Sequence, residues 1–145
     1  MLRSFLALVV LSISVLAAGC GGDSGTSPSS TSAAPYSQTD LRLGTGAEAT
    51  TGRPATVHYT LWLYDAGRAE NKGTQIESSV GAQPFTFTIG ARQVISGWDR
   101  GVPGMRVGGQ RRLVLPPDLA YGSQANGRIP ANSSLVFDIE LISVQ

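Results

Sequence analysis

Short stretches of alternating apolar and polar residues dominate the chain after residue 54. The clearest alternation is at 55–64, where every second residue from Val57 to Leu63 is apolar or aromatic. A strand with one covered and one wet face produces this period of two, and antiparallel sheets commonly contain such strands. The stretches with this pattern, each predicted to be a strand, are 55–64, 84–89, 112–115 and 134–144.

A single short helix is predicted between the second and third of these strands. The run Ser96-Gly97-Trp98-Asp99 matches a capping box with Ser96 as the N-cap, and Gly101 with the following Pro103 would end the helix after about two turns. Trp98 would pack against the apolar face of the sheet. The predicted class is therefore α+β, a curved antiparallel sheet with one short helix against it.

The first twenty residues have the layout of a secretory signal. A positive charge at Arg3 precedes an apolar run over 5–18, and the small residues 17–19 follow. The run is short for a helix that spans a bilayer, although an uncleaved membrane anchor is the alternative interpretation.

Cys20 is the only cysteine, so the chain cannot form an internal disulfide. The run Leu16-Ala17-Ala18-Gly19-Cys20 resembles the bacterial lipobox, although Leu16 lies one residue further from the cysteine than in the commonest pattern. The resemblance implies that Cys20 is lipidated, becomes the mature N-terminus and anchors the protein to a membrane of the cell envelope. Gly21 after the cysteine favours the outer membrane, facing the periplasm, in a cell with two membranes. A free reactive thiol is the alternative.

A flexible tether is predicted for 21–37 and a folded domain for 38–145. Residues 21–35 are Gly, Ser, Thr, Ala and Pro with one charge, Asp23, a composition that cannot form a core. The tether has no helical period that could form a dimerising stalk, so a monomer is expected. The net charge is +1 without a basic cluster, and nucleic-acid binding is not expected.

The side chains of the folded region offer little acid-base chemistry. His58 is the only histidine, and its place inside a predicted strand favours a packing role. A nucleophile system or a zinc site would need further imidazole or thiol groups, so no metal and no cofactor are expected. The domain is suited to binding an apolar group, or to a reaction without proton transfer.

Several sequence blocks, in order, resemble the FKBP-type peptidyl-prolyl cis-trans isomerases over about 41–145. These blocks are Val57–Thr60, Ile76–Ser79, Pro84–Phe87, Val94–Trp98, Pro117–Gly122 and Leu135–Leu141. The resemblance implies a half-barrel of antiparallel strands wrapped around the short helix, with a pocket between them. It also implies isomerisation of Xaa-Pro bonds, with proline-containing polypeptides and macrolides of the tacrolimus type as partners.

Carried across residue by residue, the resemblance implies a set of site residues. Trp98 would be the floor of the pocket, and the backbone N–H of Ile95 and the hydroxyl of Tyr121 would bond to substrate carbonyls. The position of Ile95 before the helix independently favours a free N–H there. The implied catalytic residues are Tyr59, Glu77, Ile95, Trp98, Tyr121 and Phe137, and the implied further substrate contacts are Ile76, Phe85 and Val94.

Departures from the family pattern leave alternatives open. Ile76 and Glu77 stand where the family usually has Phe-Asp, and 66–72 is a seven-residue insertion of unassigned role. A non-catalytic proline-binding or chaperone module, and a purely structural lipoprotein, are the alternative functions.

Overall fold

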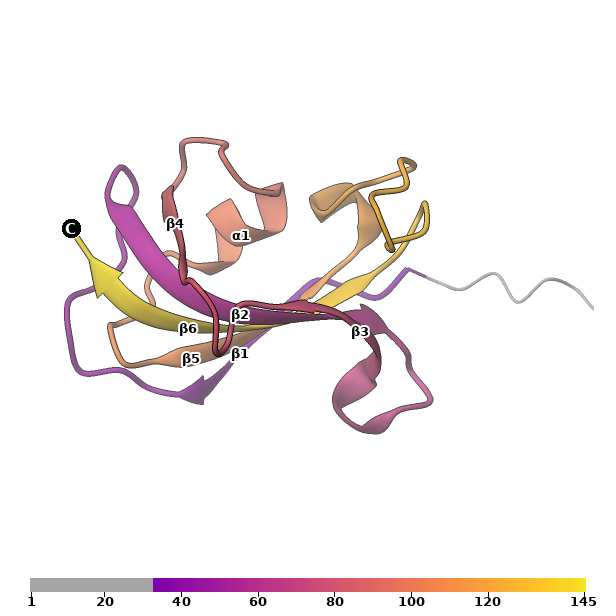
Figure 1. Ribbon diagram of the computed structural model, residues 1–145, viewed down its shortest axis with the longest axis horizontal. Coiled ribbons are helices and arrows are strands. Elements are labelled where there is room, and N and C mark those ends of the chain that lie inside the picture. The colour runs from indigo at the N-terminus through magenta and orange to yellow at the C-terminus, as the bar shows by residue number, and fades with distance from the viewer. Residues whose placement is uncertain (1–32) are drawn as a thin grey trace, which may run out of the picture. The chain divides into compact units, whose positions relative to one another are not determined.

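The computed structural model describes residues 33–145, which form a six-stranded antiparallel sheet curved around one short helix (Figure 1). The predicted α+β class is confirmed. The strands lie in the order β1-β5-β6-β2-β3, and β4 pairs with a different part of β2. The strands are β1 Ser37–Arg42, β2 Pro54–Tyr64, β3 Lys72–Ser78, β4 Phe85–Thr88, β5 Gln110–Leu115 and β6 Leu135–Val144; the helix is α1 Ser96–Gly101, and two 3-10 turns are η1 Ala69–Asn71 and η2 Pro117–Leu119.

The predicted tether ends before residue 37. Ala34 is buried, and its N–H donates to the Ser134 hydroxyl at 2.9 Å. The guanidinium of Arg100 lies 4.0 Å from the centre of the Tyr36 ring. The folded domain therefore begins a few residues before 38. The predicted signal, Cys20 and the rest of the tether lie outside the described residues.

The main core lies between the concave face of the sheet and α1. The alternating residues of β2, β5 and β6 point inward, and these strands contribute Val57, Leu113, Ile139 and Leu141, all fully buried. The pattern that predicted the strands therefore also placed their buried faces.

The opposite face of the sheet is less exposed to solvent than the alternation of apolar and polar residues predicts. Val136 and Val114 are buried there against Ala34, with Trp62 and Tyr64 packed beside them. This second cluster is small, but it covers the outer side of β5 and β6 where Ala34 packs against them.

Two glycines allow α1 to lie close against the sheet. A Cβ on Gly97 would overlap the side chain of Leu115, and a Cβ on Gly101 would overlap that of Leu113. Both leucines are fully buried and have little room to move. This close approach fixes Trp98, which lies between the two glycines and is 4% exposed.

The capping-box prediction for α1 is wrong. Ile95 occupies the N-cap, and no side chain caps the helix. The carboxylate of Asp99 turns away from the helix end and accepts hydrogen bonds from the N–H groups of Gly90 and Arg92, at 2.9 and 3.1 Å. Asp99 therefore orders the loop before the helix.

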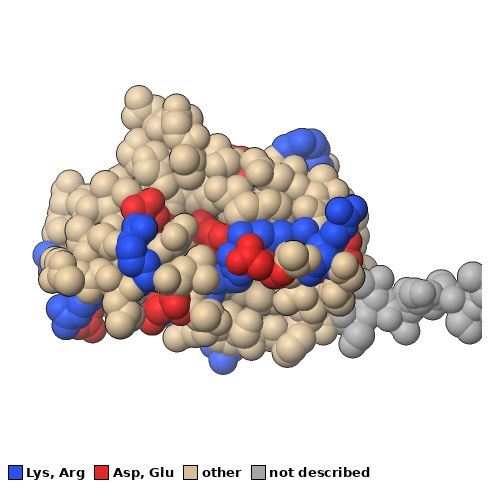
Figure 2. Space-filling view, turned by 90° about the horizontal axis from the view of Figure 1, so that it is seen from below, with Lys and Arg blue, Asp and Glu red and all other residues tan. Residues whose placement is uncertain are grey.

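The 66–72 insertion folds over the outer face of the sheet. The ammonium of Lys72 lies 4.3 Å from the centre of the Trp62 ring and 2.8 Å from the Asp138 carboxylate. Arg112 binds Asp138 with two hydrogen bonds and lies 3.0 Å from Glu70. These four charged residues, Glu70, Lys72, Arg112 and Asp138, form the outer-face ion cluster; Figure 2 shows how opposite charges gather on this side of the molecule. Within residues 33–145, no helix is both long and apolar enough to cross a membrane.

Candidate active site

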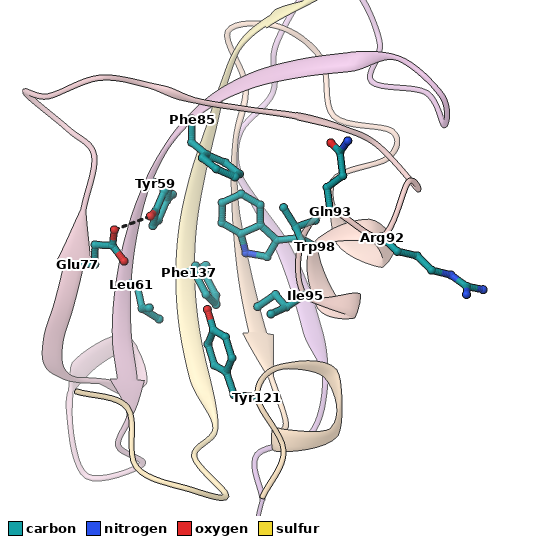
Figure 3. A pocket seen from close by; sticks show the side chains of 11 residues that line it. Tyr59, Leu61, Glu77, Phe85, Arg92, Gln93, Ile95, Trp98, Tyr121 and Phe137 are labelled. Carbon is teal, nitrogen blue, oxygen red and sulfur yellow. Dashed lines mark hydrogen bonds between the residues drawn. The ribbon is translucent and has the colours of Figure 1, made fainter. Parts of the chain in front are cut away.

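A cavity of about 390 Å³ lies between α1 and the concave face of the sheet (Figure 3). Four strands, the helix and two loops contribute to it, so distant parts of the sequence meet there. The lining residues are Tyr59, Leu61, Glu77, Phe85, Arg92, Gln93, Val94, Ile95, Trp98, Tyr121 and Phe137.

Aromatic rings surround the indole of Trp98. The ring centres of Tyr59, Phe137 and Phe85 lie 5.2, 5.4 and 6.1 Å from that of Trp98, each nearly perpendicular to it. Such edge-to-face packing is a favoured geometry for aromatic pairs. The arrangement creates a ring-lined space suited to a small apolar ring.

The indole N–H of Trp98 is buried and finds no oxygen or nitrogen partner within residues 33–145. Figure 3 shows the indole nitrogen on the side of Phe137, whose ring stands at 84° to the indole plane. A weak N–H to ring contact is available in this geometry. Leaving a donor without a strong acceptor costs stability, and such exceptions are often found at functional sites.

Tyr59 and Glu77 form the polar part of one wall. The Tyr59 hydroxyl donates to Oε1 of Glu77 at 2.9 Å. Burial, the hydrogen bond to Glu77 and the charges of Glu77 and Tyr121 raise the pKa of Tyr59 to about 12. Tyr59 is therefore a neutral donor, engaged with Glu77, at physiological pH.

Two further donors belong to residues that line the cavity, Ile95 and Tyr121. The N–H of Ile95 donates no hydrogen bond to the backbone in the described part of the chain, as its position before the first turn of α1 predicts. Burial and the charge of Glu77 raise the pKa of Tyr121, while a hydrogen bond from Asn126 opposes them. The Tyr121 hydroxyl therefore keeps its proton. Together the two groups can hold carbonyl oxygens of a bound chain.

Hydrogen bonds to the side chains of Asp99 and Gln93 hold the loop that carries Val94 and Ile95. Asp99 binds two N–H groups of this loop, and the side-chain oxygen of Gln93 accepts from the N–H of Thr88 at 2.8 Å. Arg92 has a φ of 58°, an unusual conformation for a non-glycine residue. The Asp99 carboxylate holds it there. These bonds order the loop that leads to Ile95.

The cavity brings together eight of the nine site residues that the sequence predicted and leaves out Ile76. Ile76 is 8% exposed and packs in the main core. The catalytic and binding roles of all nine stay predictions.

Sequence reasoning missed three lining residues, Leu61, Arg92 and Gln93. Leu61 lies two residues after Tyr59 and therefore on the same face of the predicted strand, and Arg92 and Gln93 directly precede Val94. The sequence therefore contained a signal for each of the three. No group of three or more potential metal-ligating side chains occurs within 33–145.

The family model of the "FKBP-type peptidyl-prolyl cis-trans isomerase" matches residues 46–142. The chain belongs to this family. An "FK506-binding protein" of Neisseria meningitidis serogroup A is 47% identical over 107 residues, which cover 72% of this chain and 92% of the relative. "FK506-binding protein 1" of Aspergillus oryzae is 41% identical over 108 residues, with 72% and 93% covered.

Solved structures of FKBP-type proteins share the fold. The crystal structure of AtFKBP13 matches with a TM-score of 0.65 and 38% identity, covering 76% of this chain and 93% of that one. FkpA from Escherichia coli matches with a TM-score of 0.64 and 32% identity. The match covers 76% of this chain but only 48% of FkpA, so FkpA has a large part without a counterpart in the match. The protein is an FKBP-type peptidyl-prolyl cis-trans isomerase.

Proposed function

We propose that the protein isomerises Xaa-Pro bonds of exported polypeptides by binding the proline ring over Trp98 and favouring the twisted amide. The observation that carries the proposal is the enclosure of Trp98 by Tyr59, Phe85 and Phe137. A ring-lined space would accept the pyrrolidine ring, and the bound ring would help to exclude water from the amide.

The reaction needs only a modest rate acceleration from the protein. The uncatalysed rotation has a barrier of about 18–20 kcal/mol and takes tens of seconds. Turnover near 10² per second needs about 10³- to 10⁴-fold acceleration, which corresponds to roughly 4–6 kcal/mol. Differential binding of the twisted amide can supply this amount without covalent or acid-base catalysis.

Desolvation and fixed donors provide the differential binding. Planar amides are the more polar form because resonance charges the oxygen and nitrogen, so a dry site disfavours them relative to the twisted form. The N–H of Ile95 would hold the carbonyl of the proline itself, and the Tyr121 hydroxyl would hold another carbonyl of the bound chain that flanks the rotating amide. Held carbonyls keep the flanking chain fixed while the amide rotates.

We infer exported substrates and a lipid anchor from the first twenty residues. A signal-like run ending at a lipobox-like cysteine supports attachment to the envelope through Cys20, with Gly21 favouring the outer membrane where there are two. Two or more acyl chains would make that attachment stable. Proline-containing clients that pass this membrane are then the substrates, and a macrolide of the tacrolimus type would compete for the same cavity.

A proline-isomerisation assay on the full chain, solubilised in detergent, tests the catalytic part of the proposal. We expect turnover of an Xaa-Pro tetrapeptide and its inhibition by tacrolimus. Phe85→Ala removes a cavity wall that is 41% exposed and should lower kcat/KM by about tenfold. Val80→Ala is the matched control because Val80 is 66% exposed and does not line the cavity. A folded protein that exchanges the peptide no faster than buffer would contradict the proposal and favour a non-catalytic binding module.

A further inference from the structure

The cavity wall next to Glu77 contains a side chain that has no assigned role. Leu61 of β2 lines the cavity, whereas Ile76 of β3 does not. Leu61 is 2% exposed and Ile76 8%, but exposed area does not say where a side chain faces. The uncovered part of Leu61 faces the cavity, and Ile76 is packed in the main core.

Strand register explains this difference. Leu61 pairs with Glu77 of β3 on one side and with Phe137 of β6 on the other. Directly paired residues of antiparallel strands project to the same face, and both partners of Leu61 line the cavity. The register then shifts: the next residue of β2, Trp62, pairs with Gln75 and not with Ile76. Ile76 is skipped and has no partner on β2.

Leu61 lies beside the aromatic enclosure and is not part of it. Tyr59, Phe85 and Phe137 close around Trp98, while Leu61 lies past Tyr59 along β2 and faces Ile95 across the cavity (Figure 3). If the proline ring binds over Trp98 with its carbonyl on Ile95 N–H, the preceding residue would extend toward the wall opposite Ile95. That wall is formed by Leu61 and Glu77.

We infer that Leu61 contacts the side chain of the residue before proline and sets the preference for its size. The inference rests on the proposed function and deepens it. The methyl groups of Leu61 offer an apolar contact, and the neighbouring Glu77 carboxylate repels an acidic side chain.

The test compares two tetrapeptides that differ only in having Leu or Ala before proline, with the full chain solubilised in detergent. The measured quantity is the ratio of kcat/KM for the Leu peptide to that for the Ala peptide. Leu61→Ala should lower this ratio by about tenfold, at the lower end of the range that one extra or missing methylene gives. Leu61→Val, a milder change that keeps more of the core, should lower it by a smaller factor.

Leu63→Ala is the matched control. It removes the same atoms from the same face of β2, and Leu63 packs against the core without lining the cavity. We expect it to leave the ratio unchanged, whatever it does to the melting temperature. The inference is overturned if both Leu61 variants lower kcat/KM equally for the Leu peptide and the Ala peptide, because a loss of folded protein would have that effect. A ratio that shifts in Ile76→Val and not in the Leu61 variants also overturns it and assigns the wall to Ile76.

Dissociation constants of the same peptides separate this inference from the proposed function. A wild-type protein that binds both peptides without catalysis would refute the proposed function, and the ratio of the two dissociation constants would then test Leu61. In that case Leu61→Ala should reduce the preference for the Leu peptide by a similar factor. Absence of binding to either peptide would overturn both.

Discussion

The polar groups of the cavity act as fixed hydrogen-bond partners rather than as proton carriers. Tyr59 is engaged with Glu77, and burial is the first cause of the raised pKa of both Tyr59 and Tyr121. Both phenols therefore stay protonated far above neutral pH. This arrangement suits a rotation in which no proton is transferred.

The rate should accordingly not depend on pH between about 6 and 9. The Tyr59 pKa is raised to about 12, so ionisation of the phenol does not begin in this window. Values of kcat/KM at constant ionic strength and several pH values provide the measurement. A sigmoidal or bell-shaped profile inside the window would show that a titrating group takes part.

Tyr121→Phe should lower kcat/KM by about three- to tenfold, because the loss of one hydrogen bond is worth roughly 1 kcal/mol. The ring would remain and keep its packing, so the melting temperature should change little. Tyr64→Phe is a suitable control, since Tyr64 packs on the outer face of the sheet. Equal effects of the two variants on the rate would argue against a substrate contact by Tyr121.

At the scale of elements, the contact between α1 and β5 determines where the cavity floor lies. Gly97 and Gly101 face Leu115 and Leu113 with no space for a side chain, and Trp98 lies between them. The position of the indole therefore depends on the distance between helix and sheet.

Gly101→Ala should lower the free energy of unfolding by about 1–3 kcal/mol, the usual cost of overpacking a core. It should also lower kcat/KM, because α1 must move outward and take Trp98 with it. Gly67→Ala is the control, since only the side chain of Asp65 would approach a Cβ there. Chemical denaturation measures the stability, and an unchanged midpoint in Gly101→Ala would contradict the close packing.

The outer-face ion cluster holds the insertion against the sheet through Asp138. Burial acts to raise the pKa of Asp138, but hydrogen bonds from Arg112 and Lys72 outweigh it and the pKa is lowered. Because the pKa of Asp138 is lower in the folded than in the unfolded state, its ion pairs stabilise the protein at any pH above the unfolded-state pKa, near 3.9. This stabilisation is lost as the pH falls through the folded-state pKa. The cluster therefore contributes to stability at neutral pH and weakens in acid.

Asp138→Asn should lower the free energy of unfolding at pH 7 by about 2–3 kcal/mol, because Arg112 and Lys72 lose a largely buried partner. The variant should also lose less stability than the wild type between pH 5 and pH 2. Glu140→Gln is the control on the same strand, since its ion pair with Arg42 is exposed and should contribute less than about 1 kcal/mol. Equal losses in the two variants would refute a special role for the cluster.

At the scale of the whole molecule, the segment before the domain limits its distance from an anchor at Cys20. A chain of 12 residues can span at most about 40 Å when fully extended, so the proposed lipid anchor at Cys20 would keep the cavity near the membrane surface. An isomerase so placed would meet polypeptides as they emerge at that surface.

Cys20→Ala should abolish labelling by radioactive fatty acid and move the protein from the membrane fraction to the soluble fraction. The folded domain is unchanged, so the isomerase activity per molecule should be retained. Retention of the variant in the membrane fraction would show that the apolar segment 5–18 anchors the chain without cleavage.

Period-two patterning determined four of the strands and their buried faces, because burial on one side leaves a direct mark on composition. It missed β1 because all six of its residues are exposed, so nothing alternates. It also did not single out β3, whose pairing shifts register at Leu61 and Trp62. The sequence also predicted eight of the residues that line the cavity, through blocks resembling the family.

Only the tertiary structure decided which side chain forms the wall beside Glu77 and how the insertion is held. Ile76 lies next to Glu77 in sequence, yet a register shift places it in the core and leaves Leu61 at the cavity. Asp138 gains its partners from residues 26 positions earlier and from the insertion. Local periodicity reports whether a position is covered, but strand register and long-range charge pairing depend on chain segments that meet only in the folded state.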